Sequence, residues 1–440
     1  MSFRKTPLAL SLAIALPVLS TAVQAQTTVT IGTVNNGDMI IMQRLASEFE
    51  EQNPDIQLDW VVLEENVLRQ RLTTDIATGS GQFDVATIGT YEVPIWAEQG
   101  WLTALDNLPD SYDVDDLLGS VREGLSYDGT LYALPFYAES SMLFYRKDLF
   151  EEAGIEAPTE PSWDDVKGWA EQLTDKDAGV YGICLRGKPG WGENAAFLTT
   201  MINTYGGQWF DMEWNPTIDS PEWKEAVNTY IELLNNYGPP GAASNGFNEN
   251  LSLMASGKCA MWVDATVAAG LLFNPEQSQV ADKIGFSQAP VAKTEKGANW
   301  LWSWSLAIPE SSDAKDAATK FISWATSKDY INLVGEQVGW TSVPPGTRTS
   351  TYENPKYTEA APFAEPVLAA IQSADPNDST LNPSPYTGVQ FVGIPEFQAI
   401  GTQVGQTIAA ALTGQMSVDQ ALASAQSSVS RTMRQAGYPK

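Results

Sequence analysis

Carboxylate, amide, guanidinium and indole side chains stand in polar segments between the apolar runs of this sequence. Carboxylates accept hydrogen bonds, arginine donates from a fixed planar fork, and asparagine does both. Indole rings add a flat apolar wall with one N–H donor. This combination suits a buried, uncharged ligand rich in hydroxyl groups, because each unpaired hydroxyl costs about 1–3 kcal/mol. The residues that we predict to bind such a ligand are Asn36, Asp38, Glu64, Glu65, Tyr91, Glu92, Glu139, Arg186, Trp191, Asp264, Trp302 and Phe391.

Several of these residues have a second interpretation. Asp38 could cap a helix instead of contacting a ligand. One of Glu64 and Glu65 should face solvent, because neighbouring side chains on an extended chain point in opposite directions. Arg186 could neutralise Glu139 across the binding cleft. These alternatives stay open at the level of sequence.

The aromatic candidates are treated in the same way. Trp191 lies in a glycine-rich loop with no helical stripe to join, which favours a ligand contact. We expect one or two of the tryptophans at positions 300, 302 and 304 to face away from the cleft, and Trp302 to face it. Phe391, with Gln390 beside it, would close one end of the site.

The polar segments of the N-terminal part each follow a predicted strand. Strands are indicated at 29–32, 56–63 and 83–88, and helices with an apolar face lie between them. This alternation predicts a parallel sheet. In such sheets ligands bind beyond the carboxyl ends of the strands, where the segments 33–38, 64–66 and 89–92 lie.

The stretch 131–150 contains two apolar runs separated by a polar break. Such a stretch suits a chain that crosses between two lobes, with Glu139 at the bottom of the cleft. The runs YALP (132–135) and LFYRKDLF (143–150) resemble the first interlobe crossing of the family 1 extracellular solute-binding proteins of bacterial ABC importers. These proteins share the fold of maltose-binding protein. The blocks 297–304 and 344–348 are similar to the sugar-alcohol (mannitol and sorbitol) branch of that family.

The resemblance implies an α/β fold of two lobes, each a mostly parallel sheet flanked by helices, hinged by two or three crossings. It covers nearly all of the chain after the N-terminal segment, and it implies ligand contacts at Asn36-Gly37-Asp38, Tyr91-Glu92, Glu139, Trp191 and Asp264. We expect the first lobe to comprise 26–137 and 288–339, and the second lobe to comprise 138–287 and 340–440.

Residues 1–25 have the pattern of a secretory signal peptide. Arg4 and Lys5 precede an apolar run at 8–19, and small residues end at Ala25. We expect cleavage after Ala25 and a periplasmic protein. No later stretch is long and apolar enough to span a membrane.

Composition excludes several classes of function. The chain has no histidine, which excludes His-based triads and the commonest zinc ligand sets. Its formal net charge of −29 repels nucleic acid and anionic membranes. We predict no metal, no cofactor and no catalytic residues. An oxidising compartment permits a disulfide between Cys184 and Cys259, but the sequence leaves their distance open.

We therefore expect a monomeric periplasmic receptor for a neutral sugar alcohol, not an enzyme. The membrane permease as its partner is implied by the resemblance. One alternative is a receptor for a mono- or disaccharide, which asks for the same residue types. A secreted glycoside hydrolase needs only paired carboxylates, but the carboxylates here stand on separate loops.

Overall fold

A five-stranded sheet forms the centre of the first lobe in the computed structural model, which describes residues 1, 26–156 and 159–438. The predicted signal peptide therefore lies, apart from Met1, outside the described residues. β10 runs antiparallel to its neighbours β3 and β6, and the N-terminal strands run parallel to one another, as predicted. The strands in their order across the sheet are β2 (Ile56–Leu63), β1 (Thr27–Val34), β3 (Val85–Ile88), β10 (Trp302–Ala307) and β6 (Ala133–Glu139).

The first connection shows how local sequence sets an element. Asn36 is the N-cap of α1 (Gly37–Gln52), because its side chain accepts a hydrogen bond from the backbone N–H of Met39 at 3.0 Å. Such a cap stabilises a helix by about 1 kcal/mol. The buried face of α1 includes Leu45 and Phe49, four residues apart, which is the spacing of one helical face. The cap is thus Asn36, and the alternative that Asp38 serves as the cap is wrong.

The second lobe contains a three-stranded sheet in the order β8 (Met261–Ala265), β7 (Ser141–Arg146), β9 (Ile284–Gln288). β7 is antiparallel to both neighbours, so the prediction of a mostly parallel sheet is wrong for this lobe. The strands are antiparallel because of the direction in which the chain enters this lobe. β7 continues from β6 and runs away from the cleft, whereas β8 ends at the cleft, with Ala265 opposite Ser141.

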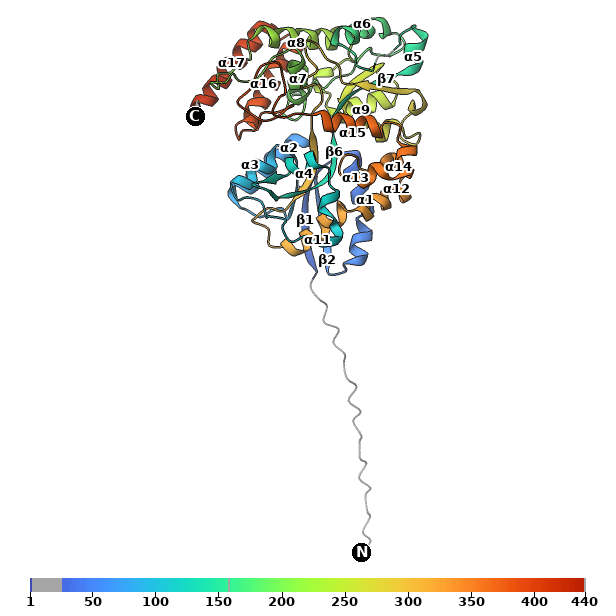
Figure 1. Ribbon diagram of the computed structural model, residues 1–440, viewed down its shortest axis with the longest axis vertical. Helices are drawn as coiled ribbons and strands as arrows, with labels where there is room; N and C mark the ends of the chain where they lie inside the picture. Colours follow the sequence, from blue (N-terminus) through green and yellow to red (C-terminus); the bar gives the residue numbers. More distant parts are fainter. Residues whose placement is uncertain (2–25, 157–158, 439–440) are drawn as a thin grey trace.

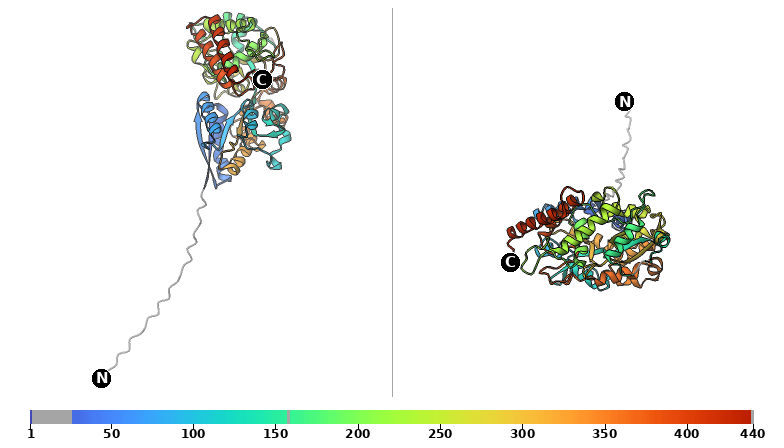
Figure 2. Two further views of the ribbon diagram at one scale, coloured as in Figure 1. Left: turned by 90° about the vertical axis from the view of Figure 1, so that its left-hand side faces the viewer. Right: turned by 90° about the horizontal axis from the view of Figure 1, so that it is seen from above.

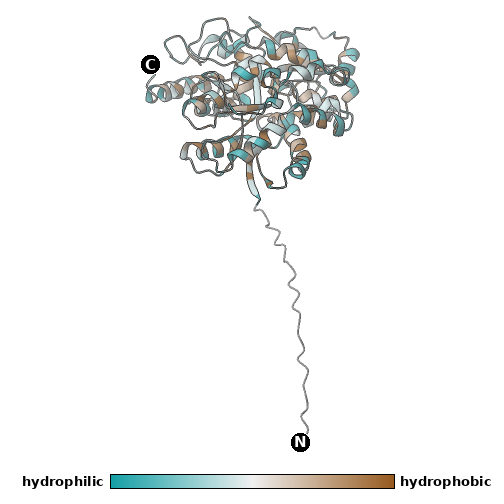
Figure 3. Cartoon of the chain, turned by 60° about the horizontal axis from the view of Figure 1, so that its bottom comes forward, coloured by the Kyte–Doolittle hydropathy of each residue, from teal (hydrophilic) through white to brown (hydrophobic). Residues whose placement is uncertain are grey.

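Helices cover both sheets, and the two lobes lie one above the other in Figure 1. The side view in Figure 2 shows the same two layers, with the C-terminal helices on the second lobe. Polar and apolar residues alternate along these helices in Figure 3, as expected of helices with one buried face. From the N-terminus to β9, the further elements are α2 (Glu65–Thr78), α3 (Glu92–Glu98), α4 (Gly119–Gly124), the hairpin β4 (Ser126–Tyr127) and β5 (Thr130–Leu131), α5 (Lys147–Glu152), α6 (Trp163–Leu173), α7 (Asn194–Thr204), α8 (Pro221–Glu232), α9 (Phe247–Ala255) and α10 (Ala268–Leu272).

The helices after β10 complete the chain. Ser417 and Gln420 form a capping box at the start of the last helix. These helices are α11 (Lys315–Ala325), α12 (Lys328–Gln337), α13 (Thr349–Glu353), α14 (Pro355–Ala360), α15 (Ala364–Ser373), α16 (Phe397–Leu412) and α17 (Val418–Gln435). Within the described residues, no helix combines the length and apolar character that a bilayer crossing requires.

The lobes are joined where β6 passes into β7. Ser140 alone separates these strands. Trp302, at the start of β10, pairs with Glu139, so the returning chain enters the first lobe directly beside the outgoing one. A third segment lies against the same place, because the backbone N–H of Ala138 donates to the carbonyl oxygen of Pro345 at 2.9 Å. The hinge is therefore narrow and lies at Glu139.

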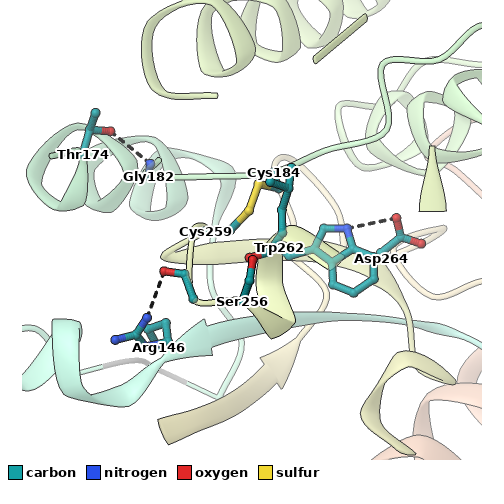
Figure 4. The surroundings of a disulfide bond; sticks show 10 residues. Arg146, Thr174, Gly182, Cys184, Ser256, Cys259, Trp262 and Asp264 are labelled. Carbon is teal, nitrogen blue, oxygen red and sulfur yellow. Dashed lines mark hydrogen bonds between the residues drawn. A yellow bond between two sulfur atoms is a disulfide. The ribbon is translucent and has the colours of Figure 1, made fainter. Parts of the chain in front are cut away.

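A disulfide joins Cys184 and Cys259 in the second lobe, which settles the question that the sequence left open (Figure 4). The two Cα atoms are 5.9 Å apart, and both residues are fully buried. Cys184 also pairs with Trp262 in a parallel bridge. The bond therefore fastens the segment that leads to Arg186 onto the strand that leads to Asp264.

Candidate functional site

A cavity of about 520 Å³ lies between the lobes. Its walls come from segments that follow β1, β2 and β6 in the first lobe, from the loop before α7 in the second lobe, and from β10. Of the three polar segments predicted to meet at the ends of the strands, 33–38 and 64–66 contribute lining residues, whereas none of residues 89–92 lines the cavity. The predicted residues that line the cavity are Asn36, Glu64, Glu65, Glu139, Arg186, Trp191 and Trp302, together with Gln390.

Three tryptophans, two in β10 and one just before it, form an apolar wall. Trp300, Trp302 and Trp304 all line the cavity, so the expectation that one or two of them face away is wrong. Positions two apart on an extended chain share a face, and the intervening residues, Leu301 and Ser303, do not line the cavity. Gly89 makes room for this wall, because a Cβ at that position would lie 2.1 Å from the Trp302 ring.

Trp191 faces this wall from the second lobe. Its ring centroid lies 6.0 Å from that of Trp302, with the two planes close to perpendicular. The loop that carries Trp191 approaches the first lobe closely, since a Cβ on Gly192 would lie 2.4 Å from Oε1 of Glu65. Both rings are almost completely buried. Ligand C–H groups could lie against either ring.

Arg69 is a cavity residue that the sequence reasoning missed. Its guanidinium lies 4.0 Å from the ring centroid of Trp191 and about 5 Å from those of Trp302 and Trp304. Nη1 donates to Glu92 at 2.6 Å and Nε donates to Glu65 at 2.9 Å. The available signal was a charged residue next to the apolar stripe of α2, four residues after Glu65.

Glu92 accordingly lies behind the wall and not in it. Its carboxylate accepts from Arg69 and from the backbone N–H of Gly89, at 3.1 Å. Burial raises the pKa of Glu92, although the Arg69 charge opposes this. Glu92 therefore positions Arg69, and Arg69 in turn contacts Trp191.

The Arg186 guanidinium is held by a second buried carboxylate. Nη2 donates to Oδ1 of Asp264 at 2.6 Å and Nε donates to Oδ2 at 2.9 Å. Asp264 is fully buried behind Arg186, and the indole N–H of Trp262 donates to it at 3.1 Å (Figure 4). Arg186 thus pairs with Asp264 and not with Glu139, and it presents its outer edge to the cavity.

Glu139 stands at the bottom of the cavity, at the end of β6. Only 6% of the residue is exposed, and no hydrogen bond or ion pair from the described part of the chain reaches its carboxylate. Burial raises the pKa of Glu139 well above its usual value, and the charge of Arg186 lowers it less. A ligand hydroxyl could donate to this carboxylate, which would replace the lost water.

Charged residues bridge the lobes at the rim. Nζ of Lys188 lies 2.5 Å from Oε1 of Glu64 and 3.6 Å from Oε1 of Glu193. Glu64 is 44% exposed at its side chain and Glu65 is 20% exposed, so Glu64 is the more solvated of the pair but both line the cavity. Lys188 and Glu193 were not predicted, because nothing in their loop distinguished them from surface charges.

The remaining predicted residues support the walls. The Tyr91 hydroxyl donates to the carbonyl oxygen of Ile394 at 2.8 Å, and its ring packs on Trp191 with centroids 4.8 Å apart. Phe391 packs on both Tyr91 and Trp302. Neither lines the cavity.

Asp38 lies at a smaller neighbouring pocket of about 50 Å³, which Tyr137 shares with the main cavity. Burial raises the pKa of Asp38 to about 7. Asn36 stands between the two pockets, because its Nδ2 donates to the Tyr137 hydroxyl at 2.8 Å.

The arrangement can bind hydroxyl groups. Acceptors and donors lie on the floor and rim, and indole faces form the side walls. Within the described residues, no group of three histidine, cysteine, aspartate or glutamate side chains is placed to hold a metal ion. Ligands held in such a cavity contact both lobes at once.

Comparisons with known proteins agree with this geometry. The model of a family described as bacterial extracellular solute-binding protein matches residues 36–331. The mannitol-binding protein of Pseudomonas aeruginosa is 59% identical over 427 residues, which cover 97% of this chain and 97% of that protein. A crystal structure of an ABC transporter solute-binding protein from Agrobacterium vitis S4 with bound D-mannitol has a TM-score of 0.93 and 60% identity, and covers 94% of this chain and 100% of its own.

A second solved structure is similar to this chain at lower sequence identity. An ABC transporter solute-binding protein from Agrobacterium radiobacter K84, in complex with ribitol, has a TM-score of 0.81 and 25% identity, and covers 93% of this chain and 99% of its own. The fold, the cleft and these matches lead to one conclusion: the chain belongs to the family of bacterial extracellular solute-binding proteins.

Proposed function

We propose that this protein is the receptor of an ABC importer that captures a neutral hexitol, D-mannitol first, and delivers it to the membrane permease. The observation that carries the proposal is the cavity, in which a buried carboxylate faces an indole wall. Support comes from the similarity, over nearly the whole chain, to a protein solved with bound D-mannitol.

Closure of the two lobes would capture the ligand. The lobes move as rigid bodies about the crossings beside Glu139, which is a hinge motion. Only the closed form offers both walls, so the ligand shifts the population by its higher affinity for that form. A micromolar Kd corresponds to about −8 kcal/mol.

The predicted site residues divide into two groups in this proposal. Those that line the cavity contact the hexitol, with Glu139 and Arg186 at hydroxyl groups and the indoles at C–H faces. The others hold these groups in place from behind. The supporting residues are Asp38, Tyr91, Glu92, Asp264 and Phe391.

The cellular setting follows from the same reading. Cleavage after Ala25 releases the mature chain into the periplasm, where it acts as a monomer and catalyses no reaction. The lobe bounds expected from the sequence, 26–137 with 288–339 and 138–287 with 340–440, shift at the crossings, because β6 of the first lobe's sheet runs to Glu139 and β9 of the second lobe's sheet runs to Gln288. Mass analysis of the exported protein tests the cleavage site, because a chain that still begins at Met1 would contradict it.

Titration calorimetry of the mature protein tests the ligand. We expect heat with D-mannitol and weaker binding of D-sorbitol and D-arabitol. Glu139→Gln should weaken mannitol binding, whereas Glu213→Gln on the exposed surface should not. Absence of heat with every polyol would overturn the proposal, and heat with a mono- or disaccharide instead would favour a saccharide receptor of the same family.

A further inference from the structure

The cavity contains more negative than positive groups. Among the described residues that line it, Glu64, Glu65, Glu139, Glu193 and Glu249 are carboxylates, whereas Arg69, Arg186 and Lys188 are the cations. Asp264 and Glu92 add two carboxylates directly behind the walls. Burying carboxylates without partners is costly, so this excess requires an explanation.

Each of the cations is already paired with a carboxylate of the protein. Arg69 contacts Glu65 and Glu92, with N–O distances of 2.8 and 2.6 Å. Arg186 forms a forked pair with Asp264. These pairs hold both guanidinium groups in the cavity walls.

Lys188 completes the pairing at the rim. It lies 2.5 Å from Glu64. The cations are therefore held in place, and apart from the longer contacts of Arg186 and Lys188 with Glu193 they pair with no further carboxylate among the described residues that line the cavity.

Among the lining carboxylates, Glu249 accepts a hydrogen bond from the backbone N–H of Gly246 at 2.8 Å. Glu193 has only longer ion pairs, to Lys188 at 3.6 Å and to Arg186 at 3.7 Å, and Glu139 is left without a partner among the described residues, as noted above. Oε2 of Glu193 is buried without a hydrogen bond from those residues, and the nearest cation atom is Nη1 of Arg186 at 3.7 Å. Burial raises the pKa of both groups, that of Glu193 to about 7. Hydroxyl groups of a neutral ligand could donate to these oxygens, whereas only a cation would also supply the charge partner that an ionised Glu139 lacks.

We propose that the cavity also binds amino-hexitols, in which an ammonium group replaces one terminal hydroxyl, with the ammonium against Glu139. This inference rests on the proposed function, because it assumes that the rest of the ligand is held as a hexitol. An ammonium carries three donors and a positive charge, so it can form an ion pair with a carboxylate in addition to donating hydrogen bonds to it. An ammonium group has the same number of heavy atoms as the hydroxyl group that it replaces, so the exchange needs little additional space.

Calorimetry with three matched ligands tests the inference. At about pH 7.5 a primary ammonium is charged, so D-mannitol, 1-amino-1-deoxy-D-mannitol and D-mannonate compare a neutral, a cationic and an anionic end. We expect the amino ligand to bind within about tenfold of D-mannitol and the anion to bind at least about a hundredfold more weakly. Glu139→Gln should weaken the amino ligand at least about tenfold more than it weakens D-mannitol. Glu213→Gln, a matched change on the exposed surface, should alter neither.

The outcomes separate the two proposals. Binding of D-mannitol without the amino ligand would overturn this inference and leave the hexitol function standing. Binding of the amino ligand alone would support the inference and overturn the neutral-hexitol function. If neither binds, both fail. An equal effect of Glu139→Gln on both ligands would overturn the placement of the ammonium.

Discussion

Trp191 belongs to the second lobe, contacts the first lobe and lines the cavity. Its ring contacts Arg69 and Trp302 of the first lobe and Tyr91 behind it. Trp191→Ala should weaken D-mannitol binding about 10- to 100-fold, because it removes an aromatic wall and the cation–π contact together. Trp191→Phe should retain most of the affinity. Calorimetry measures the affinity of both variants for D-mannitol, and an equal loss of affinity in both would contradict a role for the ring face.

Asp38 provides a prediction about pH. Its pKa is raised to about 7 in the folded protein, from 3.8. The folded state therefore holds a proton that the unfolded chain has lost between these values, and stability falls as pH rises through that window. Asp38→Asn should remove this loss and raise the free energy of unfolding at pH 8 by about 1 kcal/mol or more, with little change near pH 4. Urea unfolding of the variant and the wild type at the two pH values measures this difference in the free energy of unfolding. An equal difference at both pH values would contradict the raised pKa of Asp38.

At the scale of elements, the disulfide connects the segment that leads to Arg186 with the segment that continues into β8 and Asp264. Replacing both Cys184 and Cys259 by alanine should lower the free energy of unfolding by about 2–4 kcal/mol, because the bond restricts the unfolded chain. Thiol titration in denaturant first establishes the bond, and unfolding with and without reductant then gives its contribution. A wild-type protein that reductant does not destabilise would contradict this role.

Helices and strands could be predicted where they follow from a local pattern of apolar residues. Contacts could not be predicted where they depend on the direction of the chain or on residues far apart in the sequence. The strand–helix alternation of the first lobe follows from apolar periodicity, although α1 begins at Gly37, inside the segment 33–38 predicted as polar loop. The antiparallel sheet around β7 could not be read in this way, because it depends on the side from which the chain enters the lobe.

The candidate site was predictable to the same extent. Residue types identified Glu139 and Trp191, both of which line the cavity. Arg69 was missed, because only the folded structure brings α2 against β10 and Trp191. The wrong expectation for Trp300, Trp302 and Trp304 could have been avoided from the sequence, because residues spaced two apart on an extended chain share one face.

At the scale of the whole molecule, function depends on how closely the lobes approach. Gly192 of the second lobe allows that approach, because a Cβ there would lie 2.4 Å from Oε1 of Glu65 and 3.1 Å from Nη2 of Arg69. These side chains cannot move away freely, since they are paired with each other. Gly192→Ala should therefore hinder closure while leaving each lobe folded.

The expected result of Gly192→Ala is a loss of affinity without a loss of stability. D-mannitol binding should weaken about tenfold, and small-angle scattering should detect less compaction on adding ligand, because the closed form becomes less populated. Gly168→Ala is the matched control, since a Cβ there meets no atom within 4 Å on the exposed face of α6. A Gly192→Ala protein that binds and compacts like the wild type would mean that the lobes close less tightly than the contacts at Glu65 imply.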